Sequence, residues 1–265
     1  MISVLAASRP PEPFEAPGLE LFRPPCLAEW DALGVHFCVD RGVLYMFLAA
    51  AIVIVLFLLG ARHTGLVPRG VRNLIEAVVG FIRDEIAIQV IGQEGRPWVP
   101  FLTSMFAFIL VGNLFGIIPG IQFPVNGRIA IPAFLALLVW ALFNVAGIRA
   151  QGAAYLKNTL FPPGVPKPIY ILLTPIEFIS TFLVRPLTLS VRLLANMMAG
   201  HLILAIFFLG TAYLLAKPST IPFAVPAFAL SVALVGFEML VAVLQAYIFT
   251  ILTAVYIAGA VHPEH

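Results

Sequence analysis

The sequence predicts an all-α integral membrane protein, because apolar residues dominate it, charges are scarce and uncharged stretches reach the length of a membrane span. Hydrophobic residues make up 61% of the 265 residues and charged residues only 11%. A soluble domain carries about 25% charged residues, since its surface must face water. The net charge of +2, without a run of Lys or Arg, gives no indication of nucleic acid as a partner.

Residues 1–40 are expected to form an N-terminal segment outside the cytoplasm. Residues 1–30 contain the Pro-rich, acidic stretch PPEPFEAPGLELFRPP and lack the apolar region of a secretory signal peptide. No Arg- and Ser-rich transit segment is found either, so a prokaryotic plasma membrane is the simplest location. Cys26 and Cys38 lie in this segment without the spacing of a metal site. They can form a disulfide if the segment is outside the cell, and two unpaired thiols are the alternative.

Residues 41–265 are expected to form one membrane domain with five crossings. The first is the uncharged run GVLYMFLAAAIVIVLFLLGA, which has the roughly 20 apolar residues that a span requires. The final stretch would measure about 60 Å as a straight helix, twice the hydrocarbon thickness. We expect the last two stretches to be long, strongly tilted helices forming a hairpin, because neither has a polar break and Pro218 cannot continue a helix. The alternative is that each breaks into two spans. The expected spans are 42–61, 100–119, 129–148, 169–216 and 221–261.

Residues 72–92 are expected to form an amphipathic helix at the membrane interface, between the first two spans. Apolar residues recur there at helical spacing from Leu74 to Ile86, while Arg72 and Glu76 share another side. A helix with this pattern lies on the membrane rather than crossing it.

The basic residues of the short loops predict the orientation. The loops after the first and third spans carry more Lys and Arg than the opposite side, and loops rich in basic residues stay in the cytoplasm. The N-terminus is therefore expected outside and the C-terminus in the cytoplasm.

Ionisable residues within the last two spans are the candidates for function. Glu177, Arg192, His201 and Glu238 lie there, and an ionisable group at the centre of a membrane helix costs about 2.5–3.5 kcal/mol on insertion scales. Glu177 has a structural alternative, since a carboxylate in the first turn of a helix is favoured by the helix dipole. Arg185 is interpreted as an anchor that extends its charge to the interface.

Antiparallel folding of the two long helices places Arg192 level with Gln245, and His201 level with Glu238. On a helical wheel the face of Arg192 carries small or polar residues, which let another helix approach closely. These residues are Thr188, Ala195, Asn196 and Ala199. His201 lies roughly opposite that face, so one face suits a partner and the other a wet pocket.

The residue types suit ion transfer. An Arg stays protonated inside a membrane, so Arg192 attracts a carboxylate and repels passing cations. His201 titrates near neutral pH, and with Glu238 beside it the pair suits a proton relay. The alternatives are structural: a buried ion pair of Arg192 with Glu238 or Glu177, and a hydrogen-bonded clamp between His201 and Glu238.

Two stretches resemble a known family. RPLTLSVRLLANMMAGH, from Arg185 to His201, resembles the signature of subunit a of F-type ATP synthases. FEMLVAVLQAYIFTILTAVYIA, from Phe237 to Ala258, resembles the last helix of that family, and the likeness extends over the chain from Tyr45 onward.

The resemblance implies which residues face the rotor. Arg192 matches the arginine that faces the ring of c subunits, Asn196 matches the asparagine one turn on, and Gln245 matches the glutamine opposite the arginine. The implied partners are the c-subunit ring facing Arg192, the peripheral-stalk b subunits, the other ATP synthase subunits and membrane lipid.

The resemblance also implies an access route for protons. His201 and Glu238 match two polar positions of an outward half-channel, exchanged as in mitochondrial members, and Glu177 matches less closely because its spacing to Arg185 is one residue longer. Protons entering there neutralise ring carboxylates, which release them near Arg192 into an inward half-channel. The implied subunit is not catalytic and holds no cofactor or metal.

Two other functions compete with this interpretation. An ion-coupled secondary transporter acting alone also has long helices with charges at the midplane, but the sequence shows no internal repeat and no break beside the charges. A structural scaffold leaves the matched charges unexplained.

Overall fold

The structure is a computed structural model, and the residues that it describes are 17–18, 22, 26–32, 35–61, 70–118, 121–152, 154–161, 166–216 and 218–262. Within these residues, five helices are long and apolar enough to cross a membrane. They are Arg41–Ala61, Gln93–Leu114, Ala130–Gln151, Tyr170–Leu215 and Pro218–Val261. The predicted fold class, an all-α membrane protein with two long final helices, is confirmed.

A two-stranded antiparallel hairpin, which we did not predict from the sequence, precedes the first helix. It consists of β1 (Cys26–Ala32) and β2 (Val35–Asp40), and α1 (Arg41–Ala61) begins directly after β2. The junction residue Asp40 is buried, and its Oδ1 accepts a hydrogen bond of 3.0 Å from the Val43 amide in the first turn of α1. Such a bond satisfies an amide that the start of a helix otherwise leaves unpaired.

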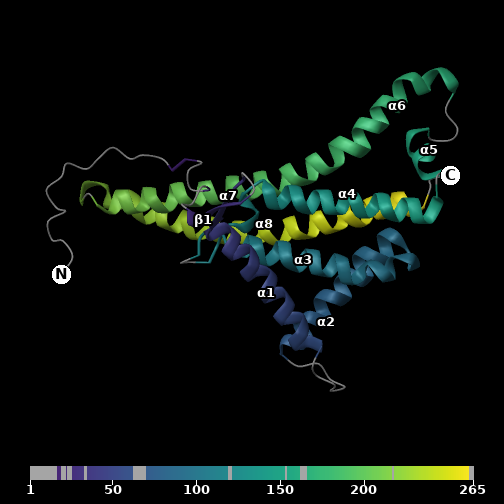
Figure 1. The fold of residues 1–265 in the computed structure, drawn as a ribbon. Coiled ribbons are helices and arrows are strands. Elements are labelled where there is room, and N and C mark those ends of the chain that lie inside the picture. Colours follow the sequence, from purple (N-terminus) through teal and green to yellow (C-terminus); the bar gives the residue numbers. More distant parts are fainter. Residues whose placement is uncertain are drawn as a thin grey trace.

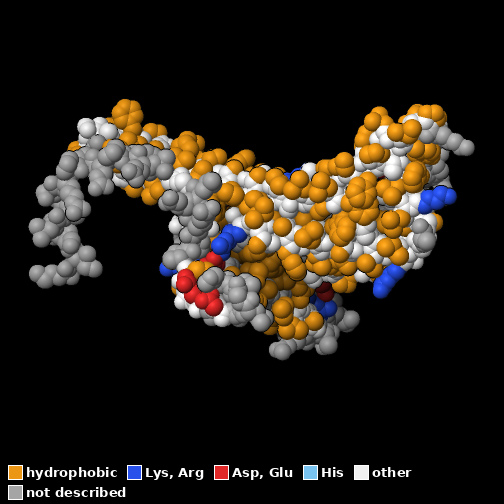
Figure 2. All heavy atoms as spheres, turned by 45° about the horizontal axis from the view of Figure 1, so that its top comes forward, with side chains coloured by type: hydrophobic (Ala, Val, Ile, Leu, Met, Phe, Trp, Pro, Cys, Tyr) orange, Lys and Arg blue, Asp and Glu red, His pale blue; other side chains and the backbone are white. Residues whose placement is uncertain are grey.

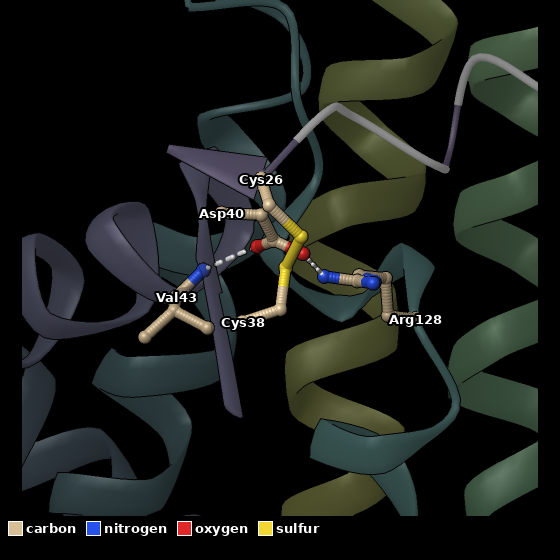
Figure 3. The surroundings of a disulfide bond; sticks show 5 residues. All are labelled: Cys26, Cys38, Asp40, Val43 and Arg128. Carbon is tan, nitrogen blue, oxygen red and sulfur yellow. Dashed lines mark hydrogen bonds and ion pairs between the residues drawn. A yellow bond between two sulfur atoms is a disulfide. The ribbon is translucent and has the colours of Figure 1, made fainter. Parts of the chain in front are cut away.

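A disulfide between Cys26 and Cys38 closes this hairpin, with 5.6 Å between the two Cα atoms (Figure 3). The disulfide thus replaces the alternative of two unpaired thiols. In the same region Oδ2 of Asp40 forms an ion pair with Arg128, which lies 88 residues further along the chain (Figure 3). The hairpin is therefore tied both to α1 and to the connection between the second and third spans.

The amphipathic segment consists of α2 (Val71–Phe81) and the π-helical η3 (Ile82–Ile91). Its polar side carries an ion pair in which Arg72 Nε lies 2.8 Å from Glu76 Oε1. Its apolar side packs against α3 and α8, and Ile82 and Ile86 are fully buried there. Its position at the membrane interface stays a prediction.

The middle of the chain supplies the helices that flank the long hairpin. These are η4 (Gln93–Trp98), α3 (Val99–Leu114), η5 (Val125–Gly127), α4 (Ala130–Gln151) and α5 (Ala154–Leu160). The main hydrophobic core forms where α3, α4, η3 and the second half of α8 meet, and Phe143 and Phe249 are the largest side chains fully buried in it.

The long hairpin begins with η6 (Lys167–Ile169), α6 (Tyr170–Ile179), the π-helical η7 (Ser180–Val184) and α7 (Arg185–Leu215). It returns through η8 (Pro218–Thr220) and α8 (Ile221–Val261), a single helix of 41 residues. In Figure 1, α7 and α8 run side by side along most of their length, whereas α6 diverges from α8. Neither stretch breaks into two spans, because α6, η7 and α7 follow one another without a gap.

Candidate functional site

The site lies where α7 and α8 pair, and two contacts define the register of the helices. Asn196 Nδ2 donates a hydrogen bond of 2.6 Å to Gln245 Oε1. Further along, Gly200 faces Glu238, because a Cβ added to Gly200 would lie 3.1 Å from Glu238 Oε1. The hydrogen-bond partner of Gln245 is therefore Asn196, one turn after Arg192.

Arg192 lies exposed on the outer face of α7. The small and polar residues predicted to share its face, Thr188, Ala195, Asn196 and Ala199, are all exposed as well. Among the described residues, no carboxylate pairs with Arg192 within the 4.0 Å limit of an ion pair. The structural alternative, a pair with Glu238 or Glu177, is thus not formed in this part of the chain.

The surface of α7 beside the face of Arg192 is apolar. Leu187 and Val191 expose 54% and 43% of their surface there. Figure 2 shows hydrophobic side chains over most of the visible face of the molecule. An exposed guanidinium in lipid is costly, so this arrangement calls for a partner that supplies negative charge.

Glu238 is buried on the neighbouring turn of α8, with only 3% of its surface exposed. Neither of its carboxylate oxygens has a hydrogen-bond partner among the described residues. It lines a cavity of about 240 Å³ between α7 and α8, together with Asn196, Gly200, Ile203 and Phe237. The rest of the lining is mostly apolar, and a buried carboxylate without a partner is stable only with water or a proton.

His201 is also buried, but it points away from that cavity. Its ring packs edge to face on Phe22, with 5.7 Å between ring centroids, and lies beside the backbone of Gly116. Its Nδ1 has no hydrogen-bond partner among the described residues. No hydrogen bond or ion pair joins His201 to Glu238 in the described part of the chain. The two residues are close in level, but the structure does not bring them into direct contact.

Glu177, the last candidate, and Arg185, interpreted above as an anchor, lie outside this cluster. Glu177 is half-buried on α6, which diverges from α8, and about 22 Å of helix separate it from Arg192. The guanidinium of Arg185 lies over the ring of Tyr256 at 5.4 Å from its centroid. This cation–π contact stabilises the charge of Arg185 within the protein.

Two buried asparagines belong to the site and were missed in the sequence. Asn126 Nδ2 donates a hydrogen bond of 2.7 Å to Asn113 Oδ1, and Asn113 Nδ2 donates one of 3.3 Å to the Ala242 carbonyl. Both asparagines are fully buried, and Asn126 Oδ1 has no partner among the described residues. Ala242 lies one turn from Glu238, so this network links α3 to α8 one turn away from the cavity. A polar residue within an apolar span is the signal that would have found Asn113.

Comparison with known proteins decides the family. The model of the family described as ATP synthase A chain matches residues 43–258. The chain belongs to this family. It is 44% identical over 257 residues to ATP synthase subunit a of Frankia alni, covering 96% of this chain and 89% of that protein.

Other members of the family are similar over comparable lengths. ATP synthase subunit a of Rhodococcus erythropolis is 40% identical over 270 residues, which cover 99% of this chain and 94% of that protein. The protein of the same name from Hyphomonas neptunium is 43% identical over 222 residues, covering 83% and 86%. Membership of the family confirms the resemblance seen in the sequence. It places this multi-pass membrane protein in ATP synthesis and proton transport.

Proposed function

We propose that this chain is the proton-translocating stator subunit of a rotary ATP synthase. In this proposal it provides two offset half-channels and holds Arg192 against the carboxylates of a ring of c subunits. The observation that carries the proposal is the exposed Arg192, which has no counterion among the described residues and lies on a face of small residues.

The exposed face of α7 suits a moving acidic partner. A guanidinium is permanently charged and donates from a planar fork, so an approaching carboxylate gives up its proton and pairs with it. The pair must also separate when the partner moves on. Small residues beside Arg192 let a helix of the partner approach closely.

The buried polar groups suit an outward half-channel. The cavity beside Glu238 lies between α7 and α8, the asparagine network bonds to Ala242 one turn further along α8, and His201 packs on Phe22 of the N-terminal segment. A proton entering from outside reaches a ring carboxylate and neutralises it, and the neutral carboxyl group then rotates into lipid. The membrane potential supplies about 2.3 kcal/mol for each charge that crosses 100 mV.

We propose that the N-terminus lies outside a prokaryotic plasma membrane and the C-terminus in the cytoplasm. The disulfide of the β hairpin suits an oxidising compartment. At the opposite end, Gln151 Nε2 donates to the Ala260 carbonyl at 2.9 Å, which joins the ends of α4 and α8. The exposed cations Arg149 and Lys157 lie at that end, as a cytoplasmic side requires. The subunit is not catalytic, and its further proposed partners are the peripheral-stalk b subunits.

Replacement of Arg192 tests the proposal. We expect Arg192→Ala to abolish ATP synthesis driven by a proton gradient, because the ring carboxylate no longer meets a fixed cation. The c ring should still copurify, since the face stays small and apolar. The measurement is ATP synthesis in inverted membrane vesicles, with Arg149→Ala as a control that removes an exposed cation from α4.

Two results would contradict the proposal. Normal coupled synthesis by Arg192→Ala would rule out the role of the guanidinium. A chain that moves ions after purification without a c ring would instead be the ion-coupled transporter considered above.

A further inference from the structure

We infer that Phe22, held by the Cys26–Cys38 disulfide, covers His201 on the outer side and limits access of water and protons to it. Phe22 is then a positioning residue of the outward half-channel. The inference rests on the proposed function and adds a role for the N-terminal segment.

Phe22 is placed by packing rather than by a membrane helix. Only 5% of its surface is exposed, although it lies in a segment rich in Pro and charge. One part of its ring lies over Gly127, where an added Cβ would be 3.1 Å from Phe22 Cδ1. Its ring also packs edge to face on His201. Phe22 therefore fills the space between the η5 connection and α7.

His201 depends on this cover for its burial. It is 8% exposed, and its Nδ1 has no hydrogen-bond partner among the described residues. Groups of this kind normally bind water when water can reach them. An aromatic ring excludes water from the outer side of the imidazole, so movement of Phe22 would control when His201 is hydrated.

In this inference the disulfide limits how far Phe22 can move, because the two are close in the sequence. Phe22 precedes Cys26 by four residues, and an extended chain of that length reaches about 14 Å. Cys26 is bonded to Cys38 at the base of β2. Asp40, two residues after Cys38, pairs with Arg128 and bonds to the Val43 amide of α1 (Figure 3). Arg128 directly follows Gly127, so the tether ends beside the surface on which Phe22 packs.

The substitution His201→Cys tests the cover directly. In whole ATP synthase within vesicles whose outer side faces the medium, the thiol of this variant would be labelled with a membrane-impermeant methanethiosulfonate. The native cysteines are paired and do not react. Adding Phe22→Ala should raise the labelling rate about two- to tenfold, the factor that corresponds to one edge-to-face ring contact. Adding Cys26→Ser with Cys38→Ser should raise it as well.

Two variants distinguish loss of the Phe22 cover from a general loosening of the packing around His201. Phe22→Trp keeps a large ring and should retain the low rate. Phe106→Ala removes another buried ring, which belongs to the main core instead, and should leave the rate unchanged. Copurification of the c ring reports that each variant is folded. Equal labelling rates with and without Phe22→Ala, in folded complexes, would overturn the inference.

A second measurement distinguishes this inference from the proposed function. With His201 restored, Phe22→Ala should change the rate of proton flux through the membrane sector and its dependence on outer pH. If Phe22→Ala raises labelling of the His201→Cys variant while the flux and its pH dependence stay unchanged, the cover stands and the proton route beside His201 is wrong.

Discussion

At the scale of single residues, the site combines a cation that is exposed with polar groups that are buried. Arg192 lies on an outer face without a counterion among the described residues, whereas Glu238 and His201 are almost fully enclosed. In a soluble protein the reverse would be expected, because charges are rarely buried there. In the proposed function, this reversal lets the cation meet a partner while the two titratable groups stay enclosed by the protein.

His201 and Glu238 are separate in the structure, and their functional coupling can be measured. We expect His201→Ala and Glu238→Gln each to slow proton entry, because each removes a titratable group beside the route. If both lie on one obligatory path, the double variant should be no slower than the slower single variant, since groups that act as a unit are not additive. Proton flux through the membrane sector is the measurement. Rates that multiply would show two independent steps.

The sequence predicted which of these residues share a level, but not which of them touch. Antiparallel pairing predicted that His201 lies level with Glu238, and its neighbour Gly200 faces Glu238. Gln245, predicted to lie level with Arg192, bonds instead to Asn196, one turn further along α7. Side chains of neighbouring residues on a helix point about 100° apart. Because Gly200 faces Glu238, the next residue, His201, points in another direction, toward Phe22. The direction of His201 involves a contact with the N-terminal segment, and the hydrophobic periodicity of the sequence does not predict such a contact.

At the scale of elements, the pairing of α7 with α8 leaves a cavity beside Gly200, which has no side chain to fill it. Gly200 lines the cavity beside Glu238, and any side chain there would point at the carboxylate. The cavity therefore depends on the lack of a side chain at Gly200. The hydrogen bond between Asn196 and Gln245 joins the two helices on one side of it.

Filling this cavity should block the route. We expect Gly200→Val to lower proton flux several-fold, because the added methyl groups displace water beside Glu238. Gly210→Val is the matched control on α7, where a Cβ meets nothing within 4 Å. Flux through the membrane sector and the yield of assembled complex are the measurements. Equal effects of the two substitutions would show that only the helix itself was disturbed.

The helices were predictable to different degrees. Uncharged runs of sufficient length marked the spans, because lipid tolerates few charges, and α8 begins and ends close to the charges and prolines that bound it. The β hairpin was not predicted, since its pairing depends on a disulfide and on the distant Arg128. The π-helical turns at Ile82–Ile91 and Ser180–Val184 were not predicted either, because the hydrophobic pattern is almost the same in an α-helix.

At the scale of the whole molecule, the described chain has one face on which an unpaired cation lies among small residues. Other outer surfaces of the helices carry large exposed apolar side chains, such as Phe134 at 65% and Phe223 at 66%. Large side chains suit lipid, and small ones suit a close protein neighbour. In the proposed function, this distribution separates a lipid-facing perimeter from a docking face for the c ring, the face of Arg192.

Bulk on the docking face should prevent assembly. We expect Ala195→Trp to abolish copurification of the c ring, because the indole holds the neighbouring helix away from Arg192. Ala141→Trp, at an exposed position on α4, should leave assembly unchanged. Subunit composition after detergent extraction is the measurement. Retention of the ring by Ala195→Trp would place the docking face elsewhere.

The length of α8 has a consequence for how sequence position maps onto the membrane. A helix of 41 residues measures about 60 Å, so it fits a hydrocarbon slab of about 30 Å only when it leans about 60° from the normal. Seven residues along it, from Glu238 to Gln245, then correspond to about 5 Å of depth and about 9 Å of sideways travel. Residues that follow one another along α8 are thus displaced mainly sideways and only slightly in depth. In the proposed function, one slanted helix can therefore serve two entrances at different angular positions around the ring.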